Sequence, residues 1–215
     1  MKRLLLSITL GTILAGCSDS SADQQAVPAP PVIHTSVALE KTDVYVPNPQ
    51  LPDDRMLTKR NQTVRDDKGE LTLQQIQFVK QTHSIGPIDM TIEEVKVIQT
   101  RPSYAMIDFF HGFTHEEAFD MVKIRVTVTN TSKQPVTFNP VAHVKINQST
   151  EKTIDDDLYL EALAGTYEPS EQRSGNLGFI TERPVEKLEF LTSDVLDAQQ
   201  QVIKKGQPFT VTLHD

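Results

Sequence analysis

The stretch 121–130 reads MVKIRVTVTN, and apolar and polar side chains alternate along it with a period of two. Successive side chains of a β-strand point to opposite faces, so this alternation separates two faces. The apolar face carries Val122, Ile124, Val126 and Val128, and the polar face carries Lys123, Arg125, Thr127 and Thr129. The pattern predicts a strand with one face in a hydrophobic core and the other in water.

The segment 88–97, IDMTIEEVKV, extends this pattern toward the N-terminus with one change of parity. Apolar residues up to Ile92 occupy even positions, whereas the two valines that follow occupy odd positions. A β-bulge at Glu93–Glu94 returns both sets to one face, because a bulge adds one residue to the strand. We therefore expect a bulged strand here.

Shorter segments with the same period follow at regular intervals. Strands are predicted at 136–138, at 142–146 with His143 pointing outward, at 176–181, at 187–192 and at 208–215. The segment 71–81 fits either a strand or a short helix. Short strands separated by turn signals, without a long amphipathic helix, predict an all-β fold, an antiparallel β-sandwich that spans residues 70–215.

The region 37–69 lacks such a period. Prolines at 47, 49 and 52 interrupt it, and charged and turn-forming residues follow. Because proline removes a backbone donor and is tolerated only at sheet edges, we expect an irregular lead-in with one short edge strand at Val44–Val46.

The N-terminus carries the features of an export signal. Lys2 and Arg3 precede an apolar stretch of about twelve residues, which is too short to span the ~30 Å hydrocarbon core of a bilayer as a helix. Residues 14–17, Leu-Ala-Gly-Cys, resemble a bacterial lipobox, in which the cysteine receives a diacylglyceryl group before cleavage on its N-terminal side. The resemblance implies that residues 1–16 are a lipoprotein signal peptide and that Cys17 is lipidated. The alternative is a free or buried thiol in an ordinary secreted protein.

A polar segment follows this cysteine. Residues 17–36 are dominated by small, polar and proline residues, which offer too little apolar surface to offset the entropy of ordering. We therefore expect a disordered tether. Two acyl chains suffice for stable attachment, so the expected partner of Cys17 is the lipid bilayer, and the expected location is the cell membrane on its extracytoplasmic face.

Composition excludes several classes of protein. Acidic residues outnumber basic ones by 29 to 21, and the formal net charge of −8 argues against nucleic acid as a partner. The single cysteine excludes an intramolecular disulfide and a thiolate metal cluster. The fold must therefore be stabilised by its hydrophobic core.

Two segments resemble a known family. Residues 121–140, MVKIRVTVTNTSKQPVTFNP, combine a long strand with an Asn-x-Ser/Thr turn, and residues 167–180, YEPSEQRSGNLGFI, combine polar residues, Ser-Gly and an apolar strand. Over about Gly86 to Leu213 the chain resembles the Telokin-like, immunoglobulin-like domain of unknown function that is common in Gram-positive bacterial lipoproteins. The resemblance implies an immunoglobulin-like sandwich and supplies no catalytic residues. We therefore expect a non-catalytic binding or structural module, without a cofactor, that faces a protein or envelope partner.

The segment 108–117, DFFHGFTHEE, is the densest set of candidate ligands. His111 and His115 have the i, i+4 spacing that lets two imidazoles share a metal on a helix, although Gly112 and Thr114 disfavour a helix. A metal-handling lipoprotein that uses these histidines is the alternative function, and a solvated loop is the structural alternative. The acidic run at 155–157 lacks the spacing of a calcium loop and predicts a charged turn.

The same region holds several aromatic residues. If Ala105, Ile107 and Phe109 form one face of a strand, then Phe110 lies on the other face. Phe113 lies beyond Gly112, in an expected turn. Phe110 and Phe113 are therefore the aromatics expected to be exposed and to bind a partner. The alternative is that the segment 103–119, called the insert below, folds back as a lid over the sandwich and buries both rings.

Overall fold

A computed structural model of the chain describes residues 46–147 and 150–214. The segments predicted to be a signal peptide (1–16) and a tether (17–36) lie outside the described residues, as do Cys17, the predicted lipidation site, and most of the edge strand expected at Val44–Val46. Among the residues that are described, no helix is long and apolar enough to cross a bilayer.

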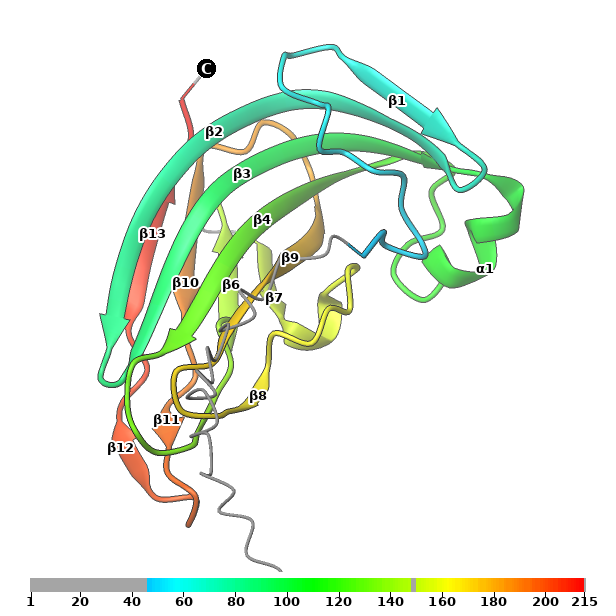
Figure 1. The fold of residues 1–215 in the computed structure, drawn as a ribbon. Helices are drawn as coiled ribbons and strands as arrows, with labels where there is room; N and C mark the ends of the chain where they lie inside the picture. Colours follow the sequence, from blue (N-terminus) through cyan, green and yellow to red (C-terminus); the bar gives the residue numbers. More distant parts are fainter. Residues whose placement is uncertain (1–45, 148–149, 215) are drawn as a thin grey trace, which may run out of the picture. The chain divides into compact units, whose positions relative to one another are not determined.

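One layer of the fold is a five-stranded antiparallel sheet, sheet A, with the order β1-β2-β3-β4-β9 (Figure 1). Its strands are β1 (Thr63–Asp66), β2 (Gly69–Ile85), β3 (Ile88–Pro102), β4 (Phe119–Asn130) and β9 (Gln172–Thr181). The segment 71–81, ambiguous in the sequence, is strand. The connection between β3 and β4 contains a 3₁₀ turn, η1 (Tyr104–Met106), and one turn of helix, α1 (Ile107–Phe110).

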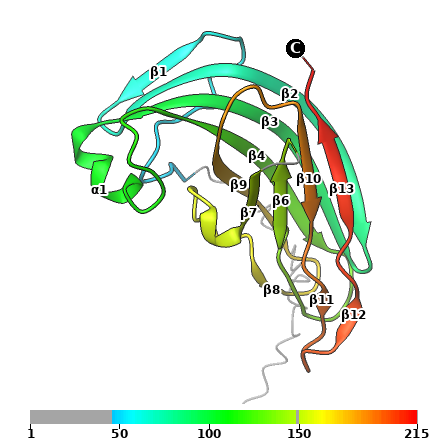
Figure 2. The ribbon, with the colours of Figure 1, turned by 180° about the vertical axis from the view of Figure 1, so that it is seen from behind.

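The other layer consists of two four-stranded sheets, with the orders β13-β10-β6-β7 and β12-β11-β5-β8. Figure 2 shows the first of them in front of the long strands of sheet A. The strands are β5 (Val136–Phe138), β6 (His143–Ile146), β7 (Thr150–Thr153), β8 (Gly165–Tyr167), β10 (Lys187–Leu191), β11 (Val195–Leu196), β12 (Val202–Lys204) and β13 (Pro208–Thr212). A 3₁₀ turn, η2 (Ile154–Asp156), follows β7. The chain is an all-β, sandwich-like protein, as predicted.

The main core lies between these two layers. The apolar face of β4 is buried there, at the four even positions expected from the sequence, and it packs with residues of β5, β6, β10, β11 and β13. Full burial of a Val or Ile side chain contributes about 1.5–3 kcal/mol. His143 points outward from β6, as predicted.

Bulges keep the long strands on this core. The register between β3 and β4 shifts between Ile92 and Glu94, which confirms the predicted bulge. As a result Ile92 and Val95, which differ in parity, are both buried in the main core. Strand β2 has two further irregularities against β3.

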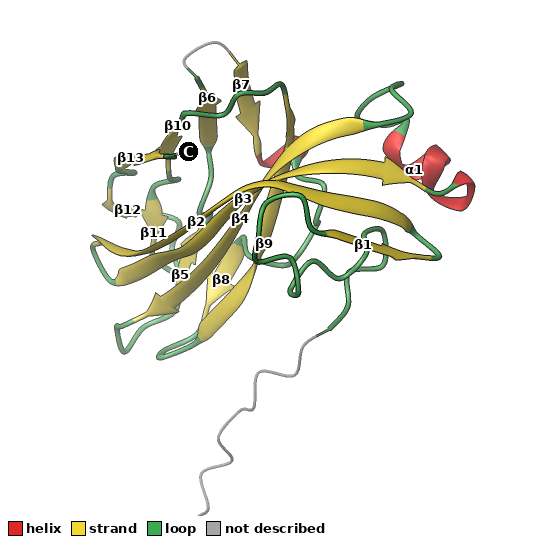
Figure 3. Cartoon of the chain, turned by 90° about the horizontal axis from the view of Figure 1, so that it is seen from above, coloured by secondary structure: helices red, strands yellow, loops and turns green. Residues whose placement is uncertain are grey.

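The opposite face of sheet A carries a second core, which the sequence analysis missed. At the α1 end of the sheet this face is apolar, and it is covered by the lead-in before β1, by the β3–β4 connection and by the loop after η2 (Figure 3). The buried members are Leu51, Leu57, Leu71, Leu73, Ile98, Phe110, Phe119, Met121, Leu158 and Tyr159. The lead-in 37–69 was expected to be irregular apart from one short edge strand, but its described part supplies β1 and two fully buried leucines.

Two side chains tie β8 to its neighbours. Asn130, at the end of β4, donates from Nδ2 to the carbonyl oxygens of Gln134 and Tyr167 at 2.8 and 3.1 Å. The Tyr167 hydroxyl in turn donates to the carbonyl of Leu163, four residues upstream. Burial raises the pKa of this hydroxyl to about 12, so it stays a proton donor at physiological pH.

Candidate functional site

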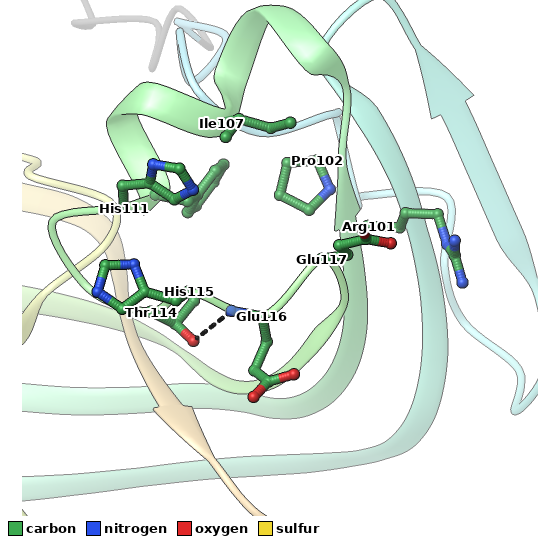
Figure 4. Close-up of a pocket in the computed structure, with 9 residues that line it drawn as sticks. Arg101, Pro102, Ile107, His111, Thr114, His115, Glu116 and Glu117 are labelled. Carbon is green, nitrogen blue, oxygen red and sulfur yellow. Dashed lines mark hydrogen bonds between the residues drawn. The ribbon is translucent and has the colours of Figure 1, made fainter.

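A cleft of about 400 Å³ lies beside α1, between the β3–β4 connection and the end of β3 (Figure 4). It is lined by Arg101, Pro102, Ile107, Phe110, His111, Thr114, His115, Glu116 and Glu117. The cleft therefore collects both histidines that the sequence analysis selected, together with one basic and two acidic side chains.

The two histidines meet because α1 ends in a tight turn. The backbone N–H of His111 donates to the carbonyl of Ile107 at 2.9 Å, and that of Thr114 donates to the carbonyl of Phe110 at 2.9 Å. The helix ends at Phe110, before both histidines, in agreement with the expectation that Gly112 and Thr114 disfavour a helix through them. The turn nevertheless brings the rings of His111 and His115 to a centroid separation of 5.5 Å with an interplanar angle of 66°.

This pair of imidazoles is the cleft's main chemical feature. Protein zinc sites combine three or four protein ligands. Across the described ranges 46–147 and 150–214, no group of three or more His, Cys, Asp or Glu side chains is placed to hold a metal ion. A metal on His111 and His115 would therefore need its remaining ligands from water or a partner.

The expectation that Phe110 is exposed is wrong. Its side chain is only 2% exposed, and its ring lies 5.3 Å from that of Phe119 and 4.9 Å from that of Phe109. Phe113 is partly buried against the same cluster, 5.5 Å from Phe109. The insert folds back as a lid because this end of sheet A presents a second apolar face that must be covered. The aromatic side chain that the insert does expose is Tyr104, at 93%.

A second polar site, which the sequence analysis missed, lies on the same face of sheet A beyond the second core. Lys96 of β3 and Lys123 of β4 are cross-strand neighbours, and both are only 2% exposed. Lys123 was expected on a wet face, but the lead-in covers it. Asp54 of the lead-in accepts hydrogen bonds from Lys123 at 2.6 and 2.7 Å and from Lys96 at 2.9 Å.

A second carboxylate completes this buried cluster. Glu94 lies 3.2 Å from the Lys96 ammonium and 3.8 Å from that of Lys123. Burial of Asp54 would raise its pKa, but the two adjacent ammonium groups outweigh burial and hold the pKa below the usual 3.8. Burial lowers the pKa of Lys123, although Asp54 opposes this effect. The cluster docks the lead-in on sheet A through charge-assisted hydrogen bonds.

A third buried acid holds the loop after η2 on β9. Asp157 was expected in a charged turn, but it is 2% exposed and accepts backbone hydrogen bonds from Gly178 at 2.7 Å and from Tyr159 and Leu160 at 3.1 Å each. Burial raises its pKa to about 6, although these hydrogen bonds act in the opposite direction. No local sequence period could indicate this role, since the partner that fixes the loop, Gly178, lies on the distant strand β9.

Comparisons of the sequence with known proteins find a family and a relative. Residues 59–202 match the family described as "Domain of unknown function (DUF4352)". The chain is 37% identical over 235 residues to the "Uncharacterized protein YdhF" of Bacillus subtilis strain 168, and the match covers 98% of this chain and 99% of that protein.

Two solved structures are also similar. A functionally unknown protein from Listeria monocytogenes EGD-e matches with a TM-score of 0.51 and 10% identity, over 68% of this chain and 89% of that chain. The yjhA protein from Bacillus subtilis matches with a TM-score of 0.43 and 14% identity, over 63% of this chain and 98% of that chain. The Listeria structure supports the fold alone. On the sequence matches, the chain belongs to the DUF4352 family.

Proposed function

We propose that this member of the DUF4352 family is a lipid-anchored, extracytoplasmic protein of the cell envelope whose immunoglobulin-like sandwich is a non-catalytic binding or structural module. The observation that carries the proposal is the segment 14–17, Leu-Ala-Gly-Cys, which follows two basic residues and an apolar stretch and contains the chain's single cysteine. Acylation of Cys17 supplies the two chains that stable membrane attachment requires.

The spacing between anchor and sandwich supports this arrangement. The tether predicted from the sequence comprises the 20 residues 17–36. As a flexible coil, a segment of this length and composition would have an end-to-end distance of roughly 25 Å. That distance is enough to hold the sandwich beyond the lipid headgroups.

The roles of the titratable groups support a non-catalytic module. Asp54 and Asp157 use their oxygens to hold the lead-in and the loop after η2, and Tyr167 uses its hydroxyl to hold the segment before β8. The Tyr167 bond resembles the tyrosine corner of immunoglobulin-like sandwiches, which supports that finer assignment of the fold. The shifted pKa values of Asp54, Asp157 and Tyr167 thus accompany the attachment of loops.

The proposal is tested by replacing Cys17. In cells that process lipoproteins, the wild-type chain should fractionate with membranes, and its mature form should carry the mass of a diacylglyceryl group. Cys17→Ala should appear in the soluble fraction or persist as an uncut precursor, while the control Ser18→Ala should behave as wild type. A mature wild-type protein whose intact mass shows an unmodified Cys17 would overturn the proposal.

A second candidate function is metal handling by the cleft beside α1, in agreement with the 5.5 Å separation of the His111 and His115 rings. Calorimetric titration with Zn²⁺ and Cu²⁺ tests it. Binding that is lost in His111→Ala and retained in His143→Ala would favour this function, because His143 is an exposed histidine on β6 away from the cleft. Equal behaviour of the two variants would exclude a site at the paired histidines.

A further inference from the structure

The second face of sheet A changes character along the strands. Beyond the second core comes a row in which Lys96 and Lys123 lie opposite each other on β3 and β4, and the next row places Glu94 opposite Arg125 and Arg125 opposite Asn176 of β9. A cleft of about 200 Å³ opens at this point. It is lined by Arg55, Glu94, Lys96, Lys123 and Arg125.

Four of these five lining residues are basic, which contrasts with the net charge of −8 of the whole chain. Most of the positive charge is matched inside the protein. Asp54 and Glu94 balance the two lysines, and Arg55 pairs with Asp53 at 2.7 Å.

Arg125 is the exception. Within the described part of the chain, its guanidinium has neither a hydrogen bond nor an ion pair, although the side chain is partly buried between β3 and β9. A guanidinium presents five N–H donors in a planar fork that matches the two oxygens of a carboxylate or phosphate. Arg125 lines the cleft, and its donors have no acceptor among the described residues.

We propose that this cleft binds a small oxyanion, a carboxylate or a phosphate group, through a bidentate contact with Arg125. Asp54 and Glu94 neutralise the buried ammonium groups of Lys96 and Lys123, so the uncompensated positive charge at the cleft is that of Arg125. Because the Arg125 side chain is partly buried, its charge acts on an anion in the cleft more strongly than that of a fully exposed arginine.

The acidic side chains near the cleft do not block such a ligand. The Glu94 carboxylate is engaged by both buried ammonium groups, at 3.2 and 3.8 Å. Glu161 lines the adjoining small cleft together with Arg125, and its two oxygens accept from the Nδ2 and the backbone N–H of Asn176 at 2.9 and 2.8 Å. Both acids are therefore committed to protein donors. The site goes beyond the proposed function, since it does not depend on membrane anchoring.

The proposal is tested by titrating the purified chain with inorganic phosphate and, separately, with acetate, at an ionic strength held constant with chloride. Binding is followed by calorimetry and by the NMR signals of the arginine side chains. We expect saturable binding of at least one anion, weakened about tenfold or more in Arg125→Gln. Arg65→Gln is the matched control, since Arg65 is an exposed arginine of β1 paired with Glu70, and it should bind as wild type.

A further variant separates the fork from its charge. Arg125→Lys keeps the positive charge and loses the planar fork, so it should bind more weakly than wild type and more tightly than Arg125→Gln. It also serves as the test variant if Arg125→Gln does not fold. The proposal is overturned if neither anion shows saturable binding to the wild-type chain, or if the Arg125 variants bind as tightly as wild type. The preferred anion identifies the ligand group as a phosphate or a carboxylate.

Discussion

The substitution Asp54→Asn provides the sharpest test of how the lead-in is held on sheet A. Asp54 accepts three hydrogen bonds from Lys96 and Lys123, all between 2.6 and 2.9 Å. An asparagine of the same shape retains one acceptor oxygen, but its amide group presents N–H donors to the second ammonium. The variant therefore leaves two buried ammonium groups against the single carboxylate of Glu94.

The expected loss follows from this uncompensated charge. Removing one partner of a buried ion pair typically costs about 3–5 kcal/mol, because the remaining charge stays desolvated. For a chain of this size each kcal/mol shifts the melting temperature by about 2–4 °C, so Asp54→Asn should melt about 6–20 °C below wild type. The amide hydrogens of the lead-in should also exchange faster in the variant. The Asp54 backbone carbonyl accepts hydrogen bonds from Lys96 and from the backbone N–H of Leu57, and these bonds open more often when the lead-in is held less firmly.

The pH dependence has a defined sign. The folded pKa of Asp54 is below its ordinary value of 3.8, so its contribution is present above about pH 4 and is lost as the pH falls through the folded pKa. The stability difference between wild type and Asp54→Asn should therefore be constant from pH 5 to 7 and shrink only below about pH 4.

The assays are thermal unfolding and urea unfolding of the purified chain at several pH values. Amide hydrogen exchange is measured over residues 46–62. Asp53→Asn is the control, because Asp53 pairs with Arg55 at the surface and such pairs contribute about 1 kcal/mol or less. If Asp54→Asn unfolds at the same urea concentration as Asp53→Asn, the buried cluster does not hold the lead-in and the reasoning is wrong.

Three further predictions concern the loops that cover sheet A. Burial raises the pKa of Asp157 to about 6, so the stability that this group contributes is fully present below about pH 4 and falls by about 3 kcal/mol as the pH rises from about 4 through 6. Asp157→Asn should remove this slope from the pH dependence of the free energy of unfolding. Gly178→Ala should lower the free energy of unfolding by about 1–3 kcal/mol, because the new Cβ would lie 2.6 Å from the ring of Tyr159. In Gly112→Ala the atom nearest to the new Cβ is 3.5 Å away, so this variant should be nearly as stable as wild type. Phe110→Ala should cost about 3–5 kcal/mol and Tyr104→Ala about 0.5 kcal/mol or less, and equal melting temperatures would show that the insert is not a lid.

The sandwich could be predicted because its signals are local. The alternation in 121–130 assigns four valines and isoleucines to the main core without any knowledge of their partners, and the change of parity after Ile92 locates the bulge. A period of two records which face of a strand is buried against an apolar layer. It also placed His143 correctly on the outer face of β6.

The second core could not be predicted in the same way, because it is built from contacts between distant segments. Lys123 looks like a solvent-facing residue in any local window, and only the lead-in, 69 residues upstream at Asp54, removes it from water. Phe110 looked exposed because a strand was assumed where the chain forms a helical turn. The available signal was the apolar Met121 on the polar face of β4, which a purely solvated face does not require.

The histidine cleft and the cleft at Arg125 have a common structural origin, because the strands of the two layers differ in length. The central strands of sheet A run for 12 to 17 residues, whereas the strands of the opposing layer have 2 to 5. A sheet that extends beyond its partner layer leaves surface to be covered, and the lead-in and the insert cover only the α1 end of the second face. The cleft at Arg125 opens where the lead-in's cover ends, and the histidine cleft forms between the insert and the end of β3. Family members with a shorter lead-in should therefore lose the Lys96–Asp54 contact and the positive cleft together, while keeping the sandwich.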